Sequence, residues 1–128
     1  MNQTTQPHPD WPWSLSEGGK IFQTFSWENI EYDLSELYPS NDSFLILEQR
    51  DPANDEHYWY IQCAIALAGP DKDSYVVGIG WGGASGRGYI ERCFPWKDLD
   101  AVIQLFEQAF QRKALDLTGF EDRSDMLF

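Results

Sequence analysis

The clearest chemical motif in the sequence is a glycine pattern, Gly78-x-Gly80-x-x-Gly83, which matches the dinucleotide-binding fingerprint as a string of residues. In that fingerprint the glycines join a strand to a helix, and the helix N-terminus binds the pyrophosphate. Here residues 75–81 alternate large and small side chains, and residues 87–94 again have the composition of a strand. The sequence therefore predicts a glycine-rich hairpin between two strands and no cofactor site.

Nucleophilic catalysis would need a histidine beside one of the two cysteines. His57 and Cys63 lie on one predicted strand, so roughly 20 Å separates them at the usual rise per residue. A pairing of His57 with Cys93 stays open, but no third group is placed to orient it. We interpret both cysteines as buried thiols in a reducing compartment.

Carboxylate chemistry is equally weakly indicated. Glu91 lies in an otherwise apolar strand, and no second carboxylate has a spacing that would place it opposite as a general acid or base. Asp71 and Asp73 form a short acidic pair, as do Asp98 and Asp100, but neither has the glycine and terminal glutamate of a calcium loop. The sequence predicts neither catalytic residues nor a metal site.

His57, the two cysteines, Glu91 and the first two glycines of the pattern belong to a run of predicted strands. The segments 57–67, 75–81 and 87–94 alternate in hydrophobicity or side-chain size, and residues 44–49 form a shorter apolar strand before them. The loops between them are too short for a crossover helix, so successive strands must be antiparallel neighbours. The sequence predicts a four-stranded antiparallel meander.

One helix is predicted on each side of this meander. Ser26 is a good N-cap residue, and an apolar stripe follows it at helical spacing until Pro39. The second helix begins near Asp98, and its apolar stripe consists of Leu99, Val102, Ile103, Phe106, Ala109 and Phe110. We expect both helices on one face of the sheet, with the glycine side of residues 75–81 as a seat for one of them.

The predicted fold is therefore an α+β two-layer sandwich with the order α-β-β-β-β-α. A chain of 128 residues is the size of one domain, which we assign to residues 11–128. Residues 1–10 are polar and proline-containing and are predicted to be a disordered tail. Residues 11–13, Trp-Pro-Trp, would either dock on the domain or be offered to a partner, and residues 21–25 would add at most a short edge strand.

The charge of the chain restricts its partners. There are 21 acidic and 9 basic residues, which gives a net charge of −12. Such a field repels nucleic acid and anionic membranes and attracts a basic protein, although acidity also serves solubility alone. No apolar run approaches the roughly 20 residues that a membrane span requires. We expect a soluble, cytoplasmic protein.

A partner-binding surface is predicted from acids and aromatic residues that lie close together. Residues 51–56 carry three acids and lead directly into a strand whose outward face is aromatic. Acids accelerate encounter with a basic partner and aromatic side chains anchor it, although a solvated acidic shell around an aromatic core would have the same composition. The predicted partner-binding residues are Asp51, Asp55, Glu56, Tyr58, Tyr60 and Trp81.

Four segments carry a resemblance to a known family: Tyr60-Ile61-Gln62, Tyr75-Val76-Val77-Gly78, Phe94-Pro95-Trp96 and the closing helix 99–110. In layout the chain resembles the small acidic α+β immunity proteins encoded beside bacterial polymorphic or contact-delivered toxins. The resemblance implies a non-enzymatic inhibitor that occludes a cognate toxin or effector with a basic surface, as a monomer or weak dimer.

Two other functions stay open. Chaperone domains for secreted effectors have a similar layout of helices and meander, and such a protein would bind an unfolded segment. A small enzyme that uses Cys93 or Glu91 is the third alternative.

Overall fold

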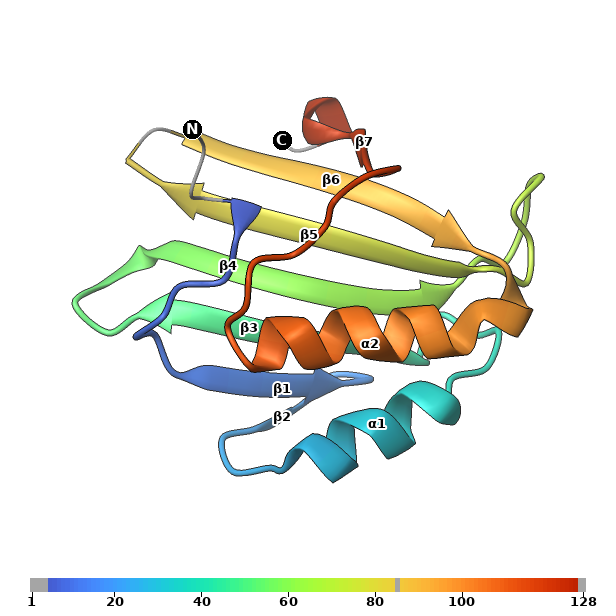
Figure 1. Cartoon of the computed structure of the whole chain (residues 1–128), viewed down its shortest axis with the longest axis horizontal. Helices are drawn as coiled ribbons and strands as arrows, with labels where there is room; N and C mark the ends of the chain where they lie inside the picture. Colours follow the sequence, from blue (N-terminus) through green and yellow to red (C-terminus); the bar gives the residue numbers. More distant parts are fainter. Residues whose placement is uncertain (1–4, 85, 127–128) are drawn as a thin grey trace.

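The computed structural model describes residues 5–84 and 86–126 of the chain, and within them seven strands form one antiparallel sheet (Figure 1). The strand order across the sheet is β2-β1-β3-β4-β5-β6-β7. The strands are β1 (Trp13–Glu17), β2 (Lys20–Phe22), β3 (Phe44–Asp51), β4 (Asn54–Ile65), β5 (Tyr75–Gly83), β6 (Gly86–Phe94) and β7 (Glu121–Asp122).

The predicted four-stranded meander is wrong, although the α+β class agrees with the structure. Strands β3 to β6 are the four predicted strands, and the sheet continues beyond them at both edges. On one side β1 pairs with β3, which places Trp13 opposite Gln49 and Leu15 opposite Leu47, and β2 pairs with β1. On the other side β7 pairs with β6. The Trp-Pro-Trp segment, residues 11–13, therefore leads directly into a strand.

Helices α1 (Trp27–Ser35) and α2 (Leu99–Phe110) both cover the same face of the sheet, which we call the helix face (Figure 1). Ser26 caps α1, because its hydroxyl accepts a hydrogen bond from the Asn29 backbone N–H while the Asn29 side chain accepts one from the Ser26 N–H. Short 3-10 helices occupy Trp96–Asp98 and Ser124–Met126.

The core lies between the helix face and the helices. Alternate residues of the central strands point into it, and α1 and α2 contribute Ile30, Leu34, Val102, Phe106 and Ala109, all of them fully buried. The strand residues of the core include Leu45, Leu47, Trp59, Ile61, Cys63, Val77 and Ile79. After α2, residues 111–120 cross the helix face to reach β7 at the far edge (Figure 1), and Leu115 is buried on the way.

The prediction that a helix seats on the glycine side of β5 is also wrong. Val77 and Ile79 point toward the helices, so the glycines between them point to the opposite face of the sheet. A helix packs better on the large apolar side chains because they bury more surface.

The N-terminal residues that the structure describes contact the helix face. The Gln6 side chain donates to the Leu115 carbonyl at 3.3 Å and accepts from the Leu115 N–H at 2.6 Å. The buried Gln49 amide bonds to both backbone groups of His8, at 2.7 and 2.8 Å. Of the predicted disordered tail, residues 1–10, residues 1–4 lie outside the described residues. Among the helices that the structure describes, none is long and apolar enough to cross a membrane.

Candidate protein-binding surface

Three tyrosine rings lie over the glycines of β5 on the sheet face opposite the helices. In the strand register Tyr58 pairs with Gly82 and Tyr60 with Gly80. A Cβ atom at either glycine would lie closer than 3.0 Å to the facing ring, and one at Gly78 would collide with Tyr89 of β6 in the same way. Only glycine leaves room for rings to lie this close to the strand. We call the group of Tyr58, Tyr60 and Tyr89 the tyrosine face; Tyr58 and Tyr60 are half-buried, whereas Tyr89 is only 7% exposed.

Hydrogen bonds and ring contacts hold the tyrosine face in one arrangement. The Tyr89 hydroxyl donates to Glu91 Oε2 at 2.8 Å and accepts from Gln62 Nε2 at 3.2 Å. The rings of Tyr58 and Tyr60 are stacked with centroids 6.2 Å apart. Side chains fixed in this way lose little conformational entropy when a partner binds them.

The hydroxyls of Tyr60 and Tyr89 on this face have raised pKa values. Burial, and then the hydrogen bond with Glu91, raises the pKa of Tyr89 well above its usual value. Burial, and then the neighbouring Tyr58, raises the pKa of Tyr60. Both phenols therefore stay neutral near pH 7, where they stack and form hydrogen bonds but do not act as phenolate nucleophiles.

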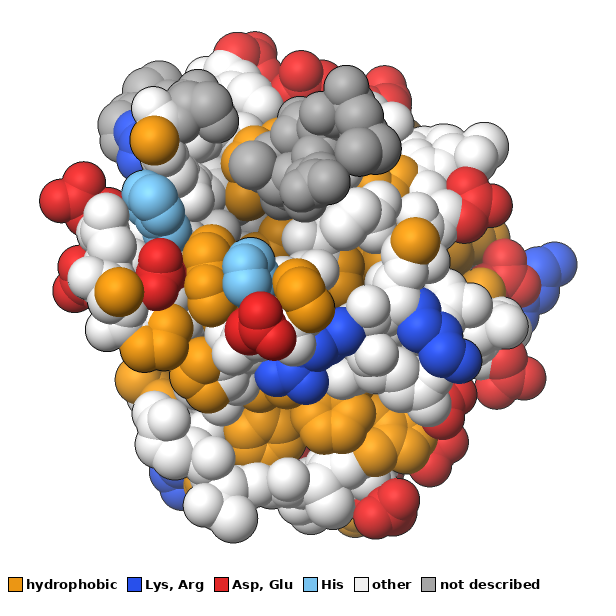
Figure 2. All heavy atoms as spheres, turned by 60° about the vertical axis from the view of Figure 1, so that its left-hand side comes forward, with side chains coloured by type: hydrophobic (Ala, Val, Ile, Leu, Met, Phe, Trp, Pro, Cys, Tyr) orange, Lys and Arg blue, Asp and Glu red, His pale blue; other side chains and the backbone are white. Residues whose placement is uncertain are grey.

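One end of the tyrosine face opens into a hollow of about 470 Å³ between the β3–β4 and β5–β6 hairpins. Arg50 borders it, with its guanidinium 5.3 Å from the Tyr58 ring centroid and 2.9 Å from Glu48 Oε2. The remaining lining consists of Asp55, Glu56, Gly82, Gly83, Gly86 and Arg87. Figure 2 turns this end of the molecule forward. Acidic side chains lie around much of its outline, and hydrophobic, basic and acidic side chains lie together nearer the centre.

Four of the six predicted partner-binding residues lie near one another. Tyr58 and Tyr60 belong to the tyrosine face, and Asp55 and Glu56 line the adjoining hollow. The Asp55 carbonyl accepts a 2.6 Å hydrogen bond from the Arg50 side chain, which joins the start of β4 to β3.

The other two predicted residues lie apart from this group. Trp81 is on the helix face, opposite Trp59, and its ring lies over Gly88. Asp51 accepts a hydrogen bond from the Ala53 N–H at 2.8 Å and lies 3.8 Å from His57.

The predicted partner-binding set leaves out Tyr89, Gln62 and Glu48, which are members or neighbours of this surface. A signal for Tyr89 was present, since three alternate glycines on one strand leave a bare face for large side chains of both neighbouring strands. Tyr58 and Tyr60 fill it from β4, and Tyr89 fills it from β6.

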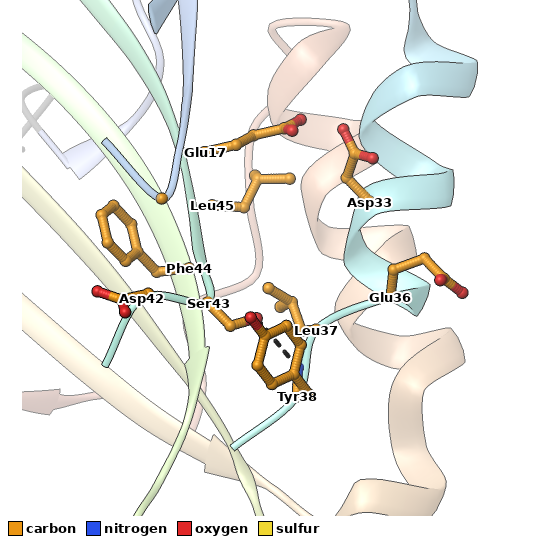
Figure 3. A pocket seen from close by; sticks show the side chains of 10 residues that line it. Glu17, Asp33, Glu36, Leu37, Tyr38, Asp42, Ser43, Phe44 and Leu45 are labelled. Atoms are coloured by element: carbon orange, nitrogen blue, oxygen red, sulfur yellow. Dashed lines mark hydrogen bonds between the residues drawn. The ribbon is translucent and has the colours of Figure 1, made fainter. Parts of the chain in front are cut away.

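A second acidic site lies at the other end of the molecule, between the end of β1, α1 and residues 36–45. This pocket of about 220 Å³ has the carboxyl groups of Glu17, Asp33, Glu36 and Asp42 in its lining and no basic residue. Figure 3 shows the side chains of Glu17 and Asp33 pointing toward one another. Burial, and then a hydrogen bond and charge repulsion from Asp33, raises the pKa of Glu17 to about 7.

The candidate nucleophiles are not activated in the described part of the chain. Burial raises the pKa of Cys63 to about 12. Burial, and then Asp71, raises the pKa of Cys93. The thiolate is the reactive form, so both cysteines stay protonated near neutral pH. Among the described residues, no three His, Cys, Asp or Glu side chains gather in a way that could hold a metal ion.

Comparison with known proteins adds no further constraint on the function. No family model, no curated protein and no solved structure matches this chain.

Proposed function

We propose that this chain is an immunity-type protein that binds a basic toxin or effector in the cytoplasm and blocks it by occlusion, without catalysis. The observation that carries this proposal is the tyrosine face, which α1 and α2 leave uncovered and in which the partly exposed rings of Tyr58 and Tyr60 stack on one another. Aromatic side chains with a polar tip are the residues most often found at the energetic centre of protein interfaces.

The charge of the chain supports a basic partner. A net charge of −12 accelerates encounter with a positively charged protein and disfavours nucleic acid. Four acids lie near the tyrosine face. Glu48 and Glu91 lie beside its rings, and Asp55 and Glu56 line the hollow at its end. Binding would therefore combine aromatic anchors with charged surroundings.

The proposal is tested by co-expression with the product of the neighbouring reading frame, measured as growth when that product is toxic. Tyr60→Ala should abolish protection, because it removes a central ring of the tyrosine face. Tyr32→Ala is the matched control, since Tyr32 lies on α1 and is 64% exposed. Circular dichroism of both purified variants would show that each is folded.

Equal protection by folded Tyr60→Ala and Tyr32→Ala would contradict the assignment of the tyrosine face. A neighbouring product that does not affect growth, with a metabolic operon around it, would contradict the immunity function itself.

One observation favours a chaperone of a secreted effector as the second candidate. Strand β2 is an edge strand, and its Ile21 and Phe22 are 69% and 40% exposed. An unfolded segment could add to such an edge by strand pairing. Mass measurement in solution with folded and with unfolded effector separates the two functions, because a chaperone binds only the unfolded form.

A further inference from the structure

We propose that residues 6–12, which we call the strap, open and close over the helix face as one unit while the rest of the fold stays intact. The strap crosses the helix face beside residues 111–120 (Figure 1), so it lies on the opposite side of the sheet from the tyrosine face. The inference therefore goes beyond the proposed function and does not depend on it.

One buried side chain fixes the middle of the strap. Gln49 of β3 is fully buried, and its amide bonds to the His8 N–H, the His8 carbonyl and the Trp11 carbonyl at 2.8, 2.7 and 3.1 Å. The His8 and Trp11 rings stack with their centroids 4.3 Å apart, which keeps the strap in one shape. A buried amide is costly unless it is hydrogen-bonded, so Gln49 is satisfied by the strap when the strap is closed and by water when it is open.

The strap is also tied at both ends to the segment that follows α2. The Gln6 side chain exchanges two hydrogen bonds with the Leu115 backbone, and the Arg112 guanidinium donates to the Trp11 carbonyl at 2.7 Å. Within residues 6–12 Pro7 alone is buried, so apolar packing adds little to these polar contacts. Segments held by few buried apolar contacts open at a lower free energy than the core does.

The closed position has a cost, because buried donors beside the strap lack acceptors. Trp13 and Trp59 flank Gln49 in a row across three strands of the helix face. The Arg112 guanidinium lies 5.4 Å from the Trp13 ring centroid. Among the described residues, the two indole N–H groups and the Arg112 Nε–H have no hydrogen-bond partner. Unpaired buried donors cost free energy, and this cost opposes the hydrogen bonds that hold the strap closed.

The first experiment is hydrogen exchange of the ¹⁵N-labelled full chain at a series of low urea concentrations. The N–H groups of His8 and Leu115, which the strap contacts hold, should exchange through a local opening that urea hardly changes. The Ile61 N–H in the centre of the sheet should exchange through global unfolding and respond strongly to urea. Equal protection and equal urea dependence of all three amides would overturn the inference.

The second experiment uses two variants, each measured at the contact that it does not touch. Gln6→Ala removes the bonds to Leu115 and should accelerate exchange of the His8 N–H by about fivefold, the effect of one net hydrogen bond. Gln49→Met removes the bonds to His8 and should accelerate exchange of the Leu115 N–H by about tenfold or more. Gln23→Ala changes an exposed glutamine outside the strap and should leave both rates unchanged.

Circular dichroism of each variant shows whether it is folded before its exchange rates are compared. In a folded variant, either Gln6→Ala or Gln49→Met, an unchanged rate at the distant amide would mean that the contacts of the strap break separately. That result would overturn the strap as a single opening unit, even if the wild-type amides exchange by local opening.

Discussion

At the scale of single residues, packing on the sheet face opposite the helices depends on glycines of β5 that leave space for tyrosine rings. Tyr60 lies so close to Gly80 that a methyl group there has no room. The ring would have to rise from the sheet, which would break its stacking with Tyr58. The glycines of the dinucleotide-like motif therefore have a steric role within the sheet.

Gly80→Ala should lower the free energy of unfolding by about 1–3 kcal/mol, the usual cost of overpacking. Gly83→Ala is the control, because a Cβ at Gly83 would have its nearest neighbour, in His57, at 3.9 Å. That variant should differ from wild type by about 0.5 kcal/mol or less. Urea unfolding followed by tryptophan fluorescence measures both, and equal midpoints would refute the steric role.

The sequence predicted Tyr58 and Tyr60 on an outward face because β4 alternates over many residues and has a continuous apolar side. The same parity argument places Trp81 with Val77 and Ile79, on the side of the core, where the structure has it. The exposure of Trp81 was inferred from its residue type alone. The alternation of side chains along the strand therefore predicts the position of Trp81 better than its residue type does.

At the scale of elements, the long central strands were predictable. Of the short edge strands, only β2 was anticipated, as the short edge strand considered for residues 21–25, and β1 and β7 were not. Strands β3 to β6 have eight to twelve residues, enough for a period of two to be recognised. Strand β1 has five residues, β2 three and β7 two, and β7 consists of two acids. Their pairing is set by neighbours far away in the sequence, and local composition does not reveal such pairing.

The contact between β1 and α1 should depend on pH through the carboxyl pair of Glu17 and Asp33. Because the pKa of Glu17 rises from 4.5 to about 7 on folding, the folded state keeps a proton that the unfolded state releases. Stability is therefore highest below about pH 4.5 for this group and falls as the pH rises through about 7. The loss should be on the order of 1 kcal/mol or less, because solvent screens the group.

This pH dependence is measured by urea unfolding at a series of pH values between 5 and 8. Glu17→Gln should flatten the profile over that window, because the amide has no proton to lose. Glu28→Gln removes an exposed acid elsewhere and should leave the slope as in wild type. A wild-type slope in Glu17→Gln would show that other groups cause the dependence.

At the scale of the whole molecule, the net charge should govern how fast a partner binds. Electrostatic steering raises association rates by about tenfold or more, and the Debye length shortens to about 3 Å at 1 M salt. The association rate should therefore fall by about tenfold between low salt and 1 M, while dissociation, set by the tyrosine face, changes less. Stopped-flow fluorescence with the toxin partner measures both rates.

A variant with Asp51, Asp55 and Glu56 changed to their amides should bind more slowly and show a flatter salt dependence. The matched control changes three exposed acids of the helices, Glu28 and Glu31 of α1 and Asp100 of α2, to their amides. If the two triple variants lose association rate equally, total charge steers the partner and the predicted loop has no special part.

The contact between Gln6 and Leu115 joins residues 109 positions apart in the chain, and it gives the protein an order of assembly during synthesis. The ribosome makes the strands that carry the tyrosine face, residues 54–94, before the segment 111–120 that crosses the helix face. The early residues around Gln6 must wait for that segment before their hydrogen bonds can form. A nascent chain halted after β6 would therefore contain every residue of the tyrosine face while the opposite side of its sheet still lacks α2 and the closing segment.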